Sequence, residues 1–252
     1  MNSIKKYFLI RWDKIKRRSK RKLKNPAPYS YTDFCKRLSD SEVSIQPFKD
    51  YNYHESEQFP FDISNDQIAS KKNVILRHDV DHNPETAYKM AEIENRFKIK
   101  STYFALTDDS SKWWWNDLEK REEYLNLYLK MQNMGHEIAL HYDFLGEFFV
   151  TGKNPLQNAT HILKIFRDFG IKIIGCASHG SGQLRKMVGV KGDLPYPIDY
   201  VNYVIWREIK RPPKEIKLNS KTLETPYMSL SDCDLFYESY FVRKDWYISD
   251  SG

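Results

Sequence analysis

Cysteine is scarce in this chain, and so are long apolar runs. The 252 residues contain only three cysteines, Cys35, Cys176 and Cys233, with no C-x-x-C pair among them. An odd number of thiols at such wide spacing argues against a disulfide framework and favours a reducing compartment, with each thiol buried. No apolar run is long enough to span a bilayer, and the run at 7–10 is too short for the core of a signal peptide. We therefore expect a cytoplasmic protein.

Aromatic residues, in contrast, are abundant. The chain has 17 Tyr, 14 Phe and 6 Trp, and 40% of its residues are hydrophobic. This composition argues against a largely disordered chain, and the length suits one large α/β domain, or a domain with an appendage. Most of these rings belong in the core of that domain, although aromatic side chains also suit stacking against sugar rings.

Positive charge is concentrated at the N-terminus. The whole chain has a net charge of +6, but residues 1–24 carry eleven Lys or Arg against the single Asp13, which gives +10 there and −4 for residues 25–252. Four apolar residues recur in this tail at helical spacing: Ile4, Phe8, Trp12 and Ile15. The pattern predicts a basic amphipathic helix that binds an anionic membrane surface, or that packs its apolar stripe on its own domain. The acidic remainder and the lack of a nucleic-acid motif argue against nucleic acid as a partner.

The chain after this tail divides into a loop-rich lead-in, residues 25–71, and a domain of residues 72–252. Pro26 and Pro28 end the basic helix, and Thr32 is a suitable N-cap for a short helix through Leu38. From residue 73 onward, short β-type runs alternate with helical ones. The predicted strands are 74–76, 102–106, 138–140, 171–177 and 201–206, and the predicted helices are 84–97, 116–134 and 155–169.

This alternation predicts an α/β fold in which crossover helices connect parallel strands. The expected closed form is a distorted (β/α) barrel with an N-terminal helical extension. Because the chemistry of such barrels lies at the carboxyl ends of the strands, candidate site residues are expected where the predicted strands end.

Two aspartates follow the first predicted strand, in the run Arg77-His78-Asp79-Val80-Asp81. Side chains alternate along a strand, so Asp79 and Asp81 share one face while His78 points to the other. Two carboxylates on one face repel each other unless a positive charge lies beside them. A metal ion bound by one would keep it ionised and would leave the other as a base for a metal-activated water. The alternative is that these aspartates only cap the helix that begins near Pro84.

Histidines follow the next predicted strands. His136 and His141 face opposite ways in an extended chain, so only His141, at the carboxyl end, is a candidate ligand, and His136 is expected to be structural. His179 follows the strand after that in a glycine-containing loop, where an ordinary loop histidine is the alternative. Asp81, His141 and His179 would then share one rim. One carboxylate and two imidazoles suit zinc, or another first-row divalent ion with open positions for water and substrate.

The order and spacing of these motifs resemble those of the NodB-homology polysaccharide deacetylases, of the carbohydrate esterase family four type. The resemblance covers roughly residues 72–182 and is carried by residues 77–81, by Thr102-Tyr103-Phe104 and by Gly135-His136-Glu137-Ile138 followed by His141. It implies a distorted barrel of that family's type. It also implies that Asp79 is the catalytic base, that Asp81 binds metal, and that His141 is the first histidine of the family's second motif.

Three features depart from the family pattern. Val80 separates two aspartates that are adjacent in the family, and Leu145 stands where the second motif has its second histidine. We expect His179 to supply that ligand instead. No histidine follows His179 to act as the family's late general acid, so either the chain is incomplete at its C-terminus or the acid is absent. The candidate substitutes are Glu224, Asp232 and Asp245.

Together these inferences predict a metal-dependent hydrolase that N-deacetylates an N-acetylated sugar in a surface-polysaccharide pathway. Zinc at Asp81, His141 and His179 would polarise the acetyl carbonyl, Asp79 would accept a proton from water, and Arg77 would hold Asp79 ionised and oriented. The basic helix would keep the enzyme at the inner membrane face. Two alternatives stay open: a non-catalytic carbohydrate-binding or scaffold protein with a retained metal site, and an iron-dependent enzyme.

Overall fold

The computed structural model describes residues 30–50, 73–107, 112–180, 202–208, 215–218, 221–239 and 247–249. The predicted basic helix of residues 1–24 lies outside these ranges, as does most of the lead-in. Among the described residues, no helix is long and apolar enough to cross a membrane. All three cysteines are described, and each is a buried free thiol, as predicted.

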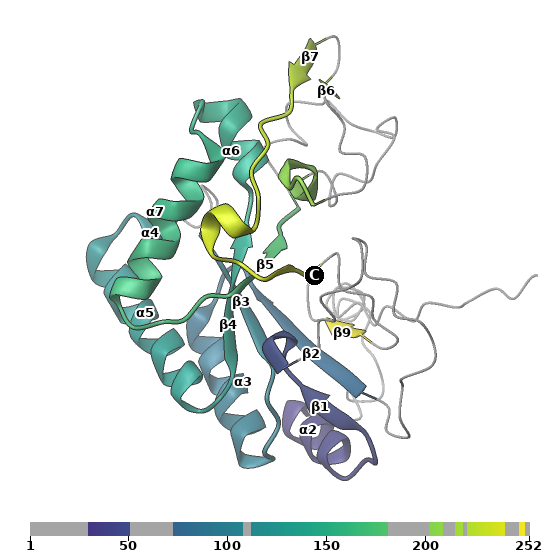
Figure 1. Ribbon diagram of the computed structural model, residues 1–252. Helices are drawn as coiled ribbons and strands as arrows, with labels where there is room; N and C mark the ends of the chain where they lie inside the picture. The colour runs from purple at the N-terminus through teal and green to yellow at the C-terminus, as the bar shows by residue number, and fades with distance from the viewer. Residues whose placement is uncertain are drawn as a thin grey trace, which may run out of the picture.

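A parallel sheet of seven strands organises the fold (Figure 1). Its strands are β1 (Ser44–Gln46), β2 (Asn73–Val80), β3 (Thr102–Leu106), β4 (Glu137–Tyr142), β5 (Gly175–Ser178), β8 (Tyr237–Glu238) and β9 (Tyr247–Ser249). They lie in the order β1-β2-β3-β4-β5-β8, and β9 pairs with β2. A separate antiparallel hairpin consists of β6 (Glu215–Leu218) and β7 (Lys221–Glu224). The α/β class and the parallel sheet predicted from the sequence are confirmed.

The sheet curls into a half-barrel. Arg77 on β2 reaches across its hollow side, where Nη1 donates to Oγ of Ser239, just after β8, over 3.1 Å. Three strands separate β2 from β8 in the sheet, so this hydrogen bond requires the sheet to bend back on itself. Within the described residues no strand pairing joins β1 to β8, and the fully closed barrel stays a prediction.

Helices α3 (Pro84–Arg96), α5 (Leu118–Asn133) and α7 (Pro155–Asp168) cover the outer face of the sheet. Each begins after an Asn or Asp whose side chain accepts a backbone N–H three residues on, and α3 and α7 have proline in the first turn. Gly135 and Gly170 follow α5 and α7 with φ of 96° and 87°, a conformation that favours glycine. The three predicted helices are confirmed to within two residues at each end.

Two local predictions are wrong. The segment 201–206, predicted as a strand, contains the 3-10 helix η5 (Asn202–Ile205), because a short apolar run does not distinguish a strand from a buried helical turn. Helix α2 (Tyr31–Ser39) is capped by Ser30 and not by Thr32. The Ser30 hydroxyl accepts the N–H of Asp33, whose carboxylate accepts the N–H of Ser30 in return, and this reciprocal capping box sets the start of the helix.

Other elements differ in extent or were not predicted. Strand β5 begins at Gly175 instead of residue 171, whereas β2 continues past residue 76 to include Asp79. Strand β1 belongs to the sheet although its residues fall in the expected loop-rich lead-in. Eight further short elements among the described residues were not predicted. They are the strands β6, β7, β8 and β9 and the helical elements η1 (Phe48–Asp50), α4 (Lys112–Trp115), α6 (Phe144–Thr151) and η6 (Ser231–Cys233).

The two largest hydrophobic cores among the described residues lie on the two sides of the sheet, and a third, small cluster contains Cys35, Leu76 and Ile99. The larger lies between the sheet and its helices, and its fully buried side chains include Trp114, Tyr128, Phe166 and Trp206. The smaller fills the hollow side and contains Phe48, Ile75, Phe104, Ala139, Ala177 and Tyr237. Each large side chain buried in these cores contributes roughly 1.5–3 kcal/mol.

The smaller core determines where the candidate site begins. Gly175 allows Tyr237 to pack there, because a Cβ at position 175 would lie 1.9 Å from Cζ of Tyr237. Ala139 on β4 contacts this core, and the next residue of β4 on the same face is His141. The carboxyl ends of the strands therefore lie just beyond the smaller hydrophobic core on the hollow side of the sheet.

Candidate metal centre

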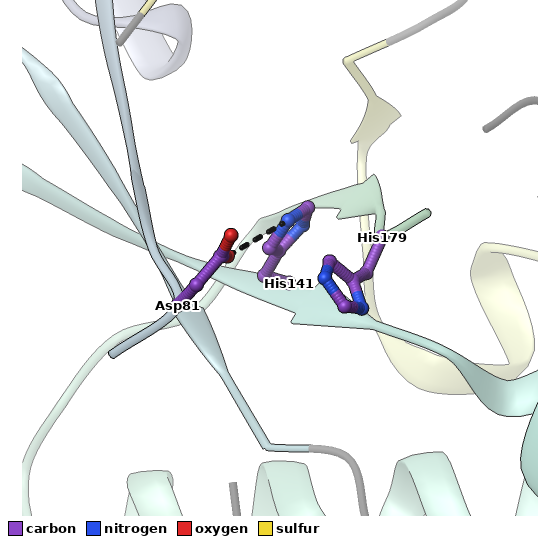
Figure 2. A group of neighbouring side chains, drawn as sticks. All are labelled: Asp81, His141 and His179. Carbon is purple, nitrogen blue, oxygen red and sulfur yellow. Dashed lines mark ion pairs between the residues drawn. The ribbon is translucent and has the colours of Figure 1, made fainter. Parts of the chain in front are cut away.

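Asp81, His141 and His179 meet at the carboxyl edge of the sheet (Figure 2). Asp81 follows β2, His141 is near the end of β4, and His179 follows β5. Each offers one ligand atom, and these atoms all lie within 4.8 Å of one another. The structure therefore brings together the three residues that the sequence singled out as metal ligands.

Strand register accounts for this convergence. His141 pairs with Leu106 on β3 and with Ala177 on β5, and Val80 pairs with Ala105. Asp81 directly follows Val80, which places it level with Leu106 on β3. Leu106 in turn pairs with His141 on β4, so Asp81 and His141 lie at the same level with β3 between them. Alternation along the strands then turns both side chains toward the hollow side of the sheet.

The ring of His141 presents its Nε2 atom to Asp81. Its Nδ1 lies 2.9 Å from the carbonyl oxygen of Ala177. A carbonyl can only accept a hydrogen bond, so Nδ1 carries the proton of the neutral ring and Nε2 has a lone pair. Burial lowers the pKa of His141, against the opposing influence of Asp79 and Asp81, and this favours the neutral form.

The carboxylate of Asp81 faces that lone pair without a hydrogen bond. Its Oδ1 lies 3.5 Å from Nε2 of His141. Although the side chain is 29% exposed, Oδ1 itself is buried and has no hydrogen-bond partner among the described residues. Two ligands of one zinc ion lie roughly 3.3 Å apart at tetrahedral angles. Both the donor atoms and their separation therefore fit a divalent cation.

His179 completes the cluster from a loop whose backbone is fixed on both sides. Its ring lies edge-on to that of His141, with centroids 5.0 Å apart. The N–H of His179 donates to the carbonyl of Tyr142 over 2.7 Å, and the carbonyl of His179 accepts from Nδ2 of Asn202 over 2.6 Å. The half-buried imidazole is thus held beside the other two ligand candidates.

Asp79 lies beside the cluster and is bound by Arg77. Nε and Nη2 of Arg77 donate to the two carboxylate oxygens over 2.5 and 3.0 Å, a bidentate pair. The guanidinium also lies over the ring of Phe104, 4.7 Å from its centroid. The structure thus contains the Arg77–Asp79 contact, while a catalytic role for Arg77 stays a prediction. The two aspartates therefore differ, because Asp79 is paired through both oxygens while Oδ1 of Asp81 is not.

The alternative that the two aspartates only cap the following helix is wrong. The N-cap of α3 is Asn83, whose side chain accepts the N–H of Thr86 over 3.0 Å. Neither aspartate is the N-cap of α3, and Asp79 instead accepts hydrogen bonds from Arg77.

The remaining predicted residues lie elsewhere. His78 and His136 are buried on the outer face, where Nε2 of His78 lies 2.6 Å from Oε1 of Glu94 and Nε2 of His136 lies 3.1 Å from the carbonyl of Ala91. Burial lowers the pKa of His136 to about 4, so this histidine is neutral and structural, as predicted. The backbone N–H of the buried Leu145 donates to Oδ1 of Asn202.

The three candidate substitutes for the general acid stay predictions. Glu224 is exposed on β7, and Asp232 is exposed and accepts the N–H of Ser229 over 2.9 Å. Asp245 lies outside the described residues.

Asn202 contacts the site but was not predicted from the sequence. Its side chain donates to the carbonyl of His179, and only this contact in the folded chain distinguishes it from any other asparagine.

The fold and the cluster together define an α/β protein with an Asp/His group at the carboxyl edge of a curled parallel sheet. Comparison with protein-family models, with curated proteins and with solved structures found no match in any of the three. The resemblance to the NodB-homology deacetylases therefore rests on the order and spacing of the sequence motifs.

Proposed function

We propose that Asp81, His141 and His179 hold a divalent cation, with zinc the best fit, and that the protein is a metal-dependent sugar N-deacetylase. One observation carries the metal site: a buried carboxylate oxygen without a hydrogen bond faces an imidazole lone pair at 3.5 Å. Two acceptors in this arrangement repel each other, and a cation between them removes the repulsion. The deacetylase activity is inferred from the motif order of residues 77–141.

The cation would supply Lewis acidity, polarising the acetyl carbonyl and acidifying a water molecule. Asp79 would act as the base. Each of its oxygens keeps a lone pair after pairing with Arg77, and the guanidinium favours the ionised carboxylate that can accept a proton. In the reaction the water oxygen bonds to the acetyl carbon, its proton passes to Asp79, and the C–N bond breaks. Acetate leaves, and the sugar nitrogen takes up a proton from solvent to become an amine.

The substrate would be an N-acetylated carbohydrate in surface-polysaccharide metabolism. The basic residues 1–24 would hold the enzyme on an anionic membrane at its cytoplasmic face, where lipid-linked glycans are assembled. Both statements rest on the sequence.

The test measures acetate release from chitooligosaccharides and from nucleotide-linked N-acetyl sugars, with zinc, manganese, cobalt or iron(II) added to metal-free protein. We expect metal-dependent release by the wild type. Asp79→Asn should lower kcat by about 100-fold or more while metal stays bound, because the base is lost and the proposed ligands are kept. Asp168→Asn, at an exposed α7 carboxylate paired with Lys164, is the control and should leave kcat unchanged.

The outcomes separate the candidate functions. Unchanged turnover in Asp79→Asn would remove the base role. Zinc binding without acetate release from any of these substrates would contradict the deacetylase and favour the non-catalytic carbohydrate-binding protein. Activity restored by iron(II) alone would replace zinc with iron in the same site.

A further inference from the structure

We propose that Asn202 is a positioning residue that sets where His179 stands relative to His141, and so controls the affinity of the cluster for a divalent cation. This inference rests on the proposed metal centre. Asn202 lies at the start of η5, distant in sequence from all three proposed ligands, and its side chain is fully buried.

The amide of Asn202 uses both of its N–H donors and one lone pair of its oxygen to contact residues that support the site. Nδ2 donates to the carbonyl of His179 over 2.6 Å and to Oδ1 of Asp143 over 2.8 Å. Oδ1 accepts the backbone N–H of Leu145 over 3.1 Å. Because that N–H can only donate, the amide has a single orientation in which all three bonds form.

These three bonds join the ends of two strands. Asp143 and Leu145 directly follow β4, which carries His141, and Oδ1 of Asp143 also accepts the N–H of Gly146 as the N-cap of α6. His179 directly follows β5. Asn202 thus links the backbone of His179 to the start of α6, the helix that follows His141. A second hydrogen bond, from the N–H of His179 to the carbonyl of Tyr142, fixes the preceding peptide group, so the backbone of His179 is held on both sides of its Cα.

A group that orients a ligand in this way affects metal affinity without touching the metal. Loss of such an outer contact typically weakens metal binding about 10- to 100-fold. The effect should pass through His179, since the carbonyl that Asn202 binds belongs to that residue. In a protein that already lacks the His179 imidazole, removal of the Asn202 amide should therefore have little further effect.

The experiment measures the zinc dissociation constant by competition with a chromogenic chelator, for the wild type, Asn202→Ala, His179→Ala and the double variant. We expect Asn202→Ala to weaken zinc binding about 10- to 100-fold. In the His179→Ala background, the same change should alter the constant by less than about twofold. Asn158→Ala is the matched control, because Nδ2 of Asn158 donates to Glu147 and joins α7 to α6 away from the cluster. It should lower the thermal midpoint of the metal-free protein and leave zinc affinity unchanged.

The possible results are distinct. A wild type that binds no zinc would refute the metal centre, and the role of Asn202 with it. A wild type that binds zinc, with Asn202→Ala binding equally well, would refute only the positioning role. Equal weakening with and without the His179 imidazole would also overturn it, because Asn202 would then act by another route. If Asn202→Ala does not fold, Asn202→Ser, which keeps one donor, carries the same comparison with a smaller expected loss.

Discussion

The imidazole of His141 and the carboxylate of Asp81 face each other through two acceptor atoms, Nε2 and Oδ1, which are 3.5 Å apart. The proton on Nδ1 of His141 is directed to the carbonyl of Ala177, and burial lowers the pKa of the ring, so a second proton on Nε2 is disfavoured. Without a cation the pair is therefore a source of instability. With one, both atoms become ligands.

Replacement of Asp81 by asparagine should affect the metal-free and zinc-loaded proteins in opposite ways. Nδ2 of the new amide can donate to Nε2 of His141, so the metal-free variant should be more stable than the wild type by about 1 kcal/mol. Zinc at about 100 times its dissociation constant should stabilise the wild type by about 2.7 kcal/mol and the variant by much less. Urea unfolding with a chelator and with added zinc measures both quantities.

Asp168→Asn is the control for Asp81→Asn, since the Asp168 carboxylate is exposed and its ion pair with Lys164 contributes little to stability. A metal-free Asp81→Asn protein that is less stable than the wild type would contradict the interpretation that Nε2 of His141 and Oδ1 of Asp81 are two acceptors that repel each other. So would a variant that zinc stabilises as strongly as the wild type.

Removal of one partner of the Arg77–Asp79 pair should be strongly destabilising. The side chains of Arg77 and Asp79 are 11% and 3% exposed, so Arg77→Met leaves a buried carboxylate without its cation. We expect a loss of about 3–5 kcal/mol in the free energy of unfolding. The double variant Arg77→Met/Asp79→Leu should recover much of that loss, because no charge then remains buried.

Urea unfolding of Arg77→Met, Asp79→Leu and the double variant measures this coupling. Lys164→Met breaks the exposed pair with Asp168 and should change stability by less than about 1 kcal/mol. A double variant no more stable than Arg77→Met would show that the loss comes from packing against Phe104 rather than from the unpaired charge.

The sequence predicted the proposed ligand set because its residues follow simple rules of strand geometry. Asp81, His141 and His179 each stand at or just past the carboxyl end of a strand, and parallel neighbouring strands bring such residues to one edge. Alternation also separated His78 from Asp79 correctly. The same reasoning fails where a contact depends on a distant segment. Nothing local to Asn202 indicates that it returns to His179, and the apolar residues after it suggested a strand instead of η5.

Buried acidic groups are another feature that periodicity does not reveal. Glu137 occupies an inward position at the start of β4, and its oxygens accept hydrogen bonds from Thr102, Tyr237 and the backbone of Lys49. These donors lie on β3, on β8 and in η1, so only the folded half-barrel brings them together.

Glu137 should make the protein less stable as the pH rises. Burial raises the pKa of its carboxyl to about 7, although the three hydrogen bonds oppose this. The folded state therefore binds a proton that the unfolded state releases near its ordinary pKa, so this stabilising contribution is complete below about pH 4 and is lost as pH rises through 7. Roughly 3 kcal/mol is the upper bound on this change.

Urea unfolding of the wild type and Glu137→Gln at pH 5 and pH 8 isolates this contribution, since the other titrating groups are common to both. The wild type should lose more stability than the variant between the two pH values. Parallel changes in the two proteins would show that the Glu137 carboxyl titrates outside this range.

The central claim is that one divalent cation is bound by Asp81, His141 and His179, and anomalous diffraction tests it most directly. Crystals of protein prepared without chelators and supplied with zinc should show one anomalous peak, recorded at the zinc absorption edge. We predict that it lies about 2.0–2.2 Å from the carboxylate oxygen and from one nitrogen of each imidazole. A zinc-supplied crystal with no peak at these three side chains would contradict the claim.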